Sequence, residues 1–455
     1  MRAHTRRGAA MGGTMMLALV GGLIAISSRQ TPVVHPVDES ALREYAGVYQ
    51  WGPDSFVYLQ MWDEFSGFGK PQLVAFDESG DVRTLYPIDS NSNFFAGPGA
   101  ATPASIESRV AFQRDAAGTI VSLTWQRNGA APRNARRVEI EQWDDVRFTN
   151  RDVQLTGTLI APSTPGKHPA IVLVHGSGAE NRAYMLPWAR FLIRHGIAVL
   201  GYDKRGVGGS TGDWNAATYE DLAGDAVAAV EYLKTRSDID SAQIGLLGIS
   251  QAGWIMPLAA VRSKDVAFLI SISGAGVTPA ETTIDQARNE MTMTGMPAAT
   301  VAAITGLIGL QYDFARTGQG WDAYAAARAT LVARMGAPPE TAFPSTPDHP
   351  QWQTIKRTYF YDPTPTLRQL TVPTLAIWGE LDNNIVADKN KPAWEAALEA
   401  AGNRDYALVV LPKANHAMLE AKVGSNAETK SLQRFVPAYF ATVKDWLARH
   451  LRGVK

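Results

Sequence analysis

GISQAG, at positions 248–253, follows the apolar run at 243–247 and leads into a helix-forming stretch that starts at Ala252. It departs from the pattern G-x-S-x-G only because Ala252 occupies the position of the second glycine, with Gly253 next. A strand, a sharp turn and a helix in this order expose the serine above a sheet, where the helix N-terminus faces any anion formed there. The flanking residues must be small because strand and helix come close together. We interpret Ala252 as a tolerated variant, since it adds one methyl group and Gly253 supplies further room.

The segments around this turn alternate between apolar strands and helices. Predicted strands end at HGSG (175–178), YDKRG (202–206), GISQAG, ISISG (270–274) and WGELD (378–382), and predicted helices cover 187–195, 219–235, 252–261, 393–401 and 436–450. Continuously apolar strands that alternate with helices predict an α/β fold, in which a mostly parallel sheet has helices on both faces. The segment at 277–366 is far longer than a crossover needs, and its Ala, Met and aromatic content predicts a helical cap.

The region at 45–147 has a different pattern. Short β-branched and aromatic segments are separated by turn residues, with no helix between them, which predicts a small antiparallel β-barrel or sandwich. No group of residues within it suggests chemistry. We expect a structural or substrate-flanking module.

The first residues predict export. Arg2, Arg6 and Arg7 precede an apolar stretch at 15–26, which is typical of a secretory signal peptide. About twelve apolar residues fall short of the roughly twenty that a membrane span needs. We therefore expect a periplasmic or secreted protein, with no stable membrane span after removal of the signal.

The predicted organisation has six parts. They are a signal peptide (1–28), a linker (29–44), the β-domain (45–147), the first part of the α/β core (148–276), the cap (277–366) and the second part of the core (367–455).

Composition excludes several classes of function. The 455 residues contain no cysteine, so disulfides, thiolate–metal sites and a cysteine nucleophile are excluded. A formal net charge of −1 gives no electrostatic basis for binding nucleic acid. The spacing of the histidines matches no metal-binding motif, and we predict no metal site.

Three residues in chain order predict nucleophilic catalysis. Ser250 is the candidate nucleophile, Asp382 follows the apolar strand before GELD, and His416 follows YALVVLP in PKANHAM. A serine nucleophile needs a histidine base, and that base needs a carboxylate to orient it. All three residues follow strands, at the edge where open α/β sheets place their sites. Glu380 is the competing acid, and we favour Asp382 because Glu380 lies nearer the strand.

HGSG predicts the anion-binding part of the same site. The two expected oxyanion donors are the backbone N–H groups of Gln251, directly after the nucleophile, and of Ser177. His175 precedes the serine, and we interpret it as a structural histidine that braces this loop. In the glycine-rich stretch that follows, Asp203 and Arg205 are interpreted as a structural ion pair or loop brace.

As an ordered set, GISQAG, HGSG with the following ENR, YDKRGVGGSTGD, GELDNNI and NHAM resemble the serine α/β-hydrolase superfamily. The resemblance covers roughly 148–455, interrupted by the cap. It is strongest to bacterial esterases related to the prolyl-oligopeptidase and acylaminoacyl-peptidase branch, and 45–147 resembles the lipocalin-like β-domains joined to such hydrolases. The family implies hydrolysis of esters or amides without a cofactor, with Ser250, Asp382 and His416 at its triad positions.

The sequence thus predicts a serine hydrolase that cleaves small acyl or aryl carboxylic esters through an acyl-enzyme. An aminopeptidase or acylpeptide hydrolase is the alternative among enzymes, and a non-catalytic binding protein is the alternative from another class. Cap aromatics either line an acyl pocket or pack the cap helices: Trp321, Trp352, Tyr359, Phe360 and Tyr361. The substrate-binding residues and the oligomeric state are not determined by the sequence.

Overall fold

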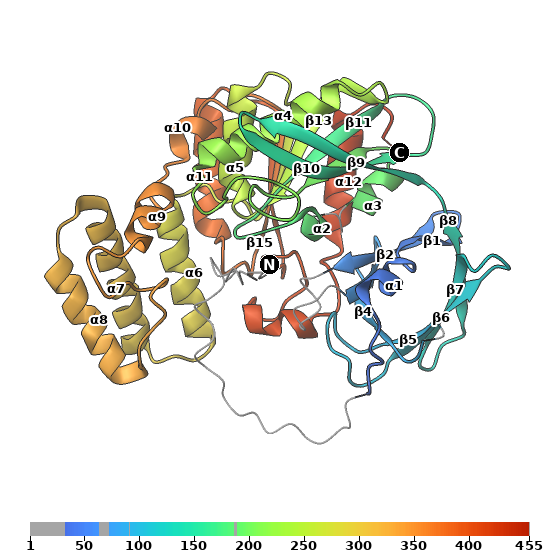
Figure 1. Ribbon diagram of the computed structural model, residues 1–455, viewed down its shortest axis with the longest axis horizontal. Helices are drawn as coiled ribbons and strands as arrows, with labels where there is room; N and C mark the ends of the chain where they lie inside the picture. Colours follow the sequence, from blue (N-terminus) through green and yellow to red (C-terminus); the bar gives the residue numbers. More distant parts are fainter. Residues whose placement is uncertain (1–31, 63–71, 91, 186–188, 455) are drawn as a thin grey trace, which may run out of the picture.

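A computed structural model describes residues 32–62, 72–90, 92–185 and 189–454. The predicted signal peptide lies outside these residues. Figure 1 shows an N-terminal β-barrel on one side, an α/β core at the centre, and helices α7 and α8 on the opposite side. The predicted α/β-hydrolase fold with an N-terminal antiparallel β-domain is confirmed.

The N-terminal domain is a closed barrel of eight antiparallel strands, because β1 pairs with both β2 and β8. The strands are β1 (Gly47–Gly52), β2 (Ser55–Trp62), β3 (Gln72–Phe76), β4 (Val82–Pro87), β5 (Asn93–Ala96), β6 (Ser108–Arg114), β7 (Ile120–Arg127) and β8 (Arg133–Val138). The short helix α1 (Glu39–Arg43) adds Leu42 to the core of the barrel, which contains Tyr49, Leu59, Phe94 and Phe112. Bulky side chains therefore fill the interior.

The boundary between barrel and core lies earlier than predicted. Residues up to Val138 pair with β1 of the barrel, whereas β9 (Glu141–Asn150) pairs with β10 of the large sheet. The expected change at 147/148 is thus corrected to the link at 139–140. Both sides of the link have β-forming side chains, and the pairing partner of a strand is a long-range property that local pattern does not encode.

The core contains an eight-stranded sheet in the order β16-β15-β14-β13-β11-β12-β10-β9. Its other strands are β10 (Val153–Pro162), β11 (His168–Val174), β12 (Ala198–Tyr202), β13 (Ile239–Ile249), β14 (Phe268–Ile272), β15 (Thr374–Gly379) and β16 (Tyr406–Leu411). From β11 onward the strands pair in parallel, and β10 pairs antiparallel with both β9 and β12. Alternate residues of β11 enter different cores, Val172 on one face and Ile171 and Leu173 on the other, which explains its unbroken apolar run.

Helices cover both faces of this sheet. Residues of α4 (Tyr219–Lys234), α5 (Ala252–Arg262) and α11 (Ala387–Ala400) pack in one core, and residues of α3 (Ala189–Arg194) and α12 (Ala438–His450) pack in the other. The short helix α2 (Arg182–Met185) and the 3₁₀ helix η2 (Asn426–Ser431) lie in loops. Helix α11 begins six residues before the predicted start at 393, because Pro392 lies inside the helix and does not begin it.

The insertion leaves the sheet after β14 and returns to it at β15. It contains α6 (Pro279–Met293), α7 (Ala298–Thr317), α8 (Trp321–Met335), α9 (Gln351–Thr358) and α10 (Thr364–Leu367). Helix α7 is long and apolar enough to cross a membrane, but 44% of its most apolar 18-residue stretch is buried inside the protein. The rings of Trp321, Trp352, Tyr359 and Phe360 pack in the same cluster, so these four side chains pack the helices of the cap.

Backbone hydrogen bonds and stacked rings join the barrel to the core. The N–H of Phe435 donates to the carbonyl of Gly80 (2.7 Å), and the N–H of Val82 donates to that of Gln433 (3.3 Å). The ring of Trp62 stacks on that of Phe435, with a centroid distance of 6.3 Å. The barrel is therefore held to the segment that precedes α12.

The same segment supports the loop that carries His416. Phe435 forms a β-bridge with Leu419, and the N–H of Val436 donates to the carbonyl of Met418 (2.9 Å). Met418 and Leu419 are fully buried and lie two and three residues after His416 in the chain. One side of this loop is thus connected to the barrel through two successive backbone contacts.

The contact between the barrel and the segment before α12 gives a prediction for Gly80→Ala. A methyl group at Gly80 would lie 2.5 Å from the backbone oxygen of Phe435, and the backbone there has a φ of +97°. Gly118, in the turn between β6 and β7, has a similar φ of +86° with nothing within 4 Å, so Gly118→Ala is the matched control. We expect Gly118→Ala to lower the free energy of unfolding by about 1–2 kcal/mol, because alanine is strained in a left-handed backbone. Gly80→Ala should lower the free energy of unfolding by about 1–3 kcal/mol more, because its methyl group also clashes with the backbone of Phe435. Parallel thermal unfolding measures both, and equal midpoints would contradict the assigned contact.

Candidate active site

Ser250 lies in a strained turn between β13 and α5. Its φ of 59° is in the left-handed region, its N–H donates to the carbonyl of Ile272 (3.0 Å), and its carbonyl accepts from Gly253 (2.9 Å). A methyl group at Gly248 would lie 2.4 Å from the Cβ of the fully buried Ala252. The turn therefore accommodates the methyl group of Ala252 because Gly248 has none.

Asp382 and His416 meet at the same edge of the sheet, after β15 and β16. The Nδ1 of His416 lies 3.0 Å from Oδ1 and 2.9 Å from Oδ2 of Asp382. The Asp382 side chain is fully buried, and that of His416 is 21% exposed. The Oδ1 atom of Asp382 also accepts from the N–H groups of Asn384 (2.9 Å) and Ile385 (2.8 Å). The carboxylate is thus fixed by its own loop while it contacts the imidazole.

The competing acid, Glu380, has another partner. Its Oε2 accepts from the N–H of Lys413 (2.9 Å), and the residue is exposed. Of the two acids that the sequence offered, the structure pairs Asp382 with His416.

Ser273 connects the loops of the site, and sequence reasoning missed it. Ser250 donates to the carbonyl of Ile272, and the next residue, Ser273, donates from Oγ to the carbonyl of His416 (2.9 Å). Ser273 also has a left-handed backbone (φ 47°), and its N–H donates to Ile377 of β15 (2.7 Å). Its position at the end of β14, between the strands that carry the other residues, was the available signal.

The two predicted donor N–H groups lie in the loops that follow β11 and β13. Gln251 is the residue before α5, and Ser177 lies in the exposed loop after β11. Within the described part of the chain, neither N–H donates a hydrogen bond to a protein acceptor. Both groups are therefore free to bind an anion.

His175 is a structural histidine. Its Nε2 lies 2.6 Å from the carbonyl oxygen of Tyr202, and its ring meets that of Tyr202 edge-on. Burial, together with the positive charge of Lys204, lowers the pKa of His175 to about 3. A neutral, buried imidazole bound to a carbonyl braces the loop, as predicted.

Asp203 and Arg205 both brace the glycine-rich loop after β12, which was one of the two predicted roles, but they do not form an ion pair with each other. Arg205 pairs with Asp225 of α4 (2.7 Å). Asp203 instead accepts from the backbone N–H groups of Arg182 (2.9 Å) and Gly209 (2.8 Å). Asp225 lies twenty residues further along the chain than Arg205, so no local pattern indicated this pairing.

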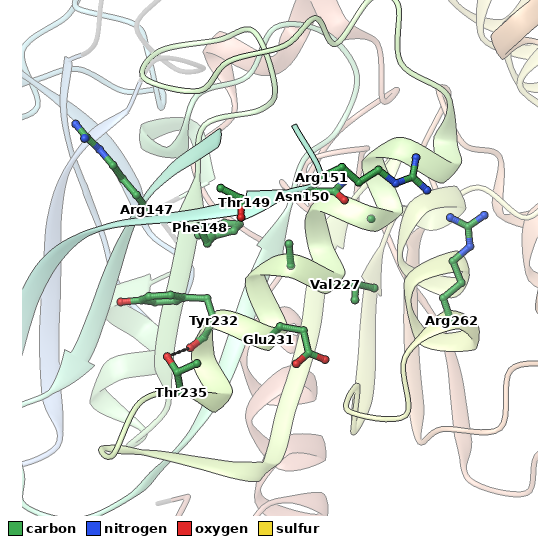
Figure 2. A pocket seen from close by; sticks show the side chains of 12 residues that line it. Arg147, Phe148, Thr149, Asn150, Arg151, Val227, Glu231, Tyr232, Thr235 and Arg262 are labelled. Carbon is green, nitrogen blue, oxygen red and sulfur yellow. Dashed lines mark hydrogen bonds between the residues drawn. The ribbon is translucent and has the colours of Figure 1, made fainter. Parts of the chain in front are cut away.

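The described residues contain no group of three His, Asp or Glu side chains arranged to hold a metal ion. They do contain two open hollows away from Ser250. One, of about 610 Å³, lies between β9 and α4; Figure 2 shows its edge residues Arg147, Arg151 and Arg262 and the hydrogen bond from Thr235 to the carbonyl of Tyr232. The other, of about 840 Å³, lies between α7 and α8. Neither is lined by Ser250, Asp382 or His416.

Comparison with known proteins identifies the family. The model of the alpha/beta hydrolase family matches residues 171–424, more than half of the chain. The chain belongs to the alpha/beta hydrolase family. The match to this family begins in β11 and ends beyond His416, so it includes all three candidate residues and the insertion.

Individual relatives are more distant. Esterase EstD of Thermotoga maritima is 25% identical over 294 residues, 61% of this chain and 62% of the relative. Quorum-quenching protein AidA of Acinetobacter baumannii is 29% identical over 128 residues, 28% of this chain and 42% of the relative. The chain therefore spans less than two thirds of these relatives. Pyrococcus horikoshii acylaminoacyl peptidase is 16% identical, with a TM-score of 0.43 and coverage of 85% of this chain and 55% of that one.

The geometry gives a prediction for Asp382→Asn. An asparagine can keep the acceptor for Asn384 and Ile385, but its amide would point N–H groups at His416 and favour the wrong tautomer. We expect a fall in kcat of about 10⁴-fold, the loss found in the best-studied triad. Ester hydrolysis and thermal unfolding should be measured together, because the fold should be retained.

Glu380→Gln is the matched control. Glutamine keeps the acceptor for Lys413, so kcat should change by less than about threefold, below about 0.7 kcal/mol. A severe loss in this variant, with a mild one in Asp382→Asn, would assign the acid to Glu380.

Proposed function

We propose that this alpha/beta hydrolase is a serine esterase that acts on small acyl or aryl carboxylic esters. Ser250 Oγ attacks the ester carbonyl, and His416 accepts its proton and transfers it to the leaving alcohol. Water then attacks the acyl-enzyme, with His416 as base again, and releases the acid and Ser250. Atoms balance over the two steps: one ester and one water give one alcohol and one carboxylic acid.

Asp382 orients the base in this mechanism. A carboxylate at Nδ1 requires that this nitrogen carries the proton, so Nε2 is the nitrogen that accepts the proton of Ser250. The buried carboxylate also stabilises the imidazolium that forms at each step.

The N–H groups of Gln251 and Ser177 stabilise the oxyanion. Both are backbone donors, so they need no reorganisation when charge develops on the carbonyl oxygen. The N-terminus of α5 adds its partial positive charge at the same place. An oxyanion donor of this kind contributes about 3 kcal/mol.

The observation that carries the proposal is the contact between His416 and the buried Asp382, at the sheet edge where Ser250 has a strained left-handed backbone. A binding protein gains nothing from a histidine oriented by a buried carboxylate beside a strained serine. The esterase name of the Thermotoga maritima relative supports the choice of esters.

We also propose that the protein is exported to the periplasm or the medium and acts there on a soluble small-molecule ester, without nucleic-acid partners. The basic and apolar N-terminal residues and the net charge of −1 support this proposal.

Labelling by a fluorophosphonate tests the nucleophile. The reagent should modify Ser250 alone, and Ser250→Ala should abolish labelling and lower kcat by about 10⁶-fold, leaving the residual rate of the oxyanion site. Peptide mapping by mass spectrometry locates the adduct. Modification at another serine, or full activity of Ser250→Ala, would reject the proposal. Faster cleavage of peptide amides than of esters would instead favour a peptidase.

Acyl-chain preference tests the substrate class. The Tyr219 ring packs against Trp254 and against Tyr361 of the insertion, with centroid distances of 5.4 and 5.0 Å. Such crowding beside the nucleophile leaves room for short groups. We expect kcat/KM for p-nitrophenyl acetate or butyrate to exceed that for the palmitate ester by at least about tenfold, or about 1.4 kcal/mol. Preference for palmitate, or activation at a lipid interface, would indicate a lipase.

A further inference from the structure

Lys204 is a buried cation directly beneath the proposed oxyanion site. It follows β12, and the residue is only 2% exposed. Its Nζ donates to the carbonyls of Gly176 (2.7 Å) and Gly178 (3.0 Å) and to Oε1 of Gln251 (3.0 Å). All three acceptors are neutral oxygen atoms, and they belong to the two segments that supply the proposed donors.

The first contact acts on the Ser177 donor through one peptide group. The carbonyl of Gly176 and the N–H of Ser177 belong to the same planar trans peptide, so they point in opposite directions. An ammonium group on the carbonyl side therefore turns the N–H to the other side. It also polarises the peptide, which strengthens the N–H as a donor.

The second segment is held through the Gln251 side chain. Lys204 donates to Oε1 of this side chain (3.0 Å). The contact with Lys204 thus holds the side chain of Gln251 on one side of the turn, and its backbone N–H donates to no protein acceptor among the described residues.

We propose that Lys204 is a positioning residue for ester hydrolysis: its ammonium form holds both oxyanion donors, and loss of its proton releases them. This inference rests on the proposed function, because it assigns the N–H groups of Ser177 and Gln251 to the oxyanion. Lys204 itself touches no reacting atom.

The surroundings of Lys204 make its charge sensitive to pH. Burial lowers its pKa to about 8, while the carboxylates of Glu180, on the same loop as Ser177, and of Asp225 on α4 act in the opposite direction. The charge of Asp225 is itself paired with Arg205 (2.7 Å), and neither the neutral His175 nor the Trp214 ring, 5.7 Å from Nζ, adds a charge. Lys204 is charged below about pH 8 and loses its proton as the pH rises through this value, so kcat should fall there.

Lys204→Met tests the proposal with p-nitrophenyl acetate at pH 7. Methionine keeps the length of the side chain and removes its donors. We expect kcat to fall at least about 100-fold, as for loss of one oxyanion donor, with KM changed less than about threefold. Inhibition by a trifluoromethyl ketone, which forms a charged hemiketal on a serine, should weaken by a similar factor. The wild-type kcat should show an alkaline limb near pH 8 that Lys204→Met lacks.

Controls separate this result from loss of fold and from failure of the proposed function. Lys234, at the far end of α4, pairs with Asp265 and serves as the control lysine. Lys234→Met should keep kcat within about twofold. The fluorophosphonate should still label Lys204→Met at Ser250, slowly but completely. Absence of labelling in the wild type would reject the esterase mechanism itself.

If Lys204→Met does not fold, the pH dependence of kcat in the wild type decides, because a kcat that stays flat to pH 10 overturns the proposal. Retention of kcat within about threefold, or an effect on KM alone, overturns it as well.

Discussion

The left-handed backbone of Ser250 is the constraint on which the rest of the site depends. A non-glycine residue in this region costs roughly 1–3 kcal/mol and persists only where its surroundings fix it. Here β13 lies between β11 and β14, Gly248 leaves room for the methyl group of Ala252, and the N–H of Ser250 is bound to Ile272. The sheet and helix α5 together hold the serine in a conformation that a free loop would not keep.

The other functional groups are arranged around this turn by short hydrogen-bonded connections. On one side, Ile272 binds Ser250 and Ser273 binds the backbone of His416, so the proposed nucleophile and the proposed base are linked through the end of β14. On the other side, Lys204 links the Gly176–Gly178 loop to the Gln251 side chain. The parallel sheet makes these links possible because successive strands end at one edge.

The two additional parts of the chain contact different loops of the site. The barrel reaches the loop of His416 through Phe435 and Leu419. Helix α6 reaches the loop of Asp382, where Gln286 bonds to Asn384 (3.1 Å). Residues of the barrel also share a core with α3 and α12, so this domain is an integral part of the hydrolase and not a loosely tethered module.

The sequence alone determined the class of fold, the parallel sheet, the insertion and the ordered set Ser250, Asp382 and His416, because strand-end motifs and hydrophobic periodicity are local signals. Only the tertiary structure decided the link at 139–140, the pairing of Arg205 with Asp225 and the contacts of Ser273 and Lys204. Lys204 stood inside the quoted stretch YDKRG, yet nothing in its neighbours along the chain indicated that its ammonium group lies under the loop of Ser177. Such pairings depend on which strands lie side by side in the sheet, and that order is a long-range property which neither spacing nor side-chain chemistry encodes locally.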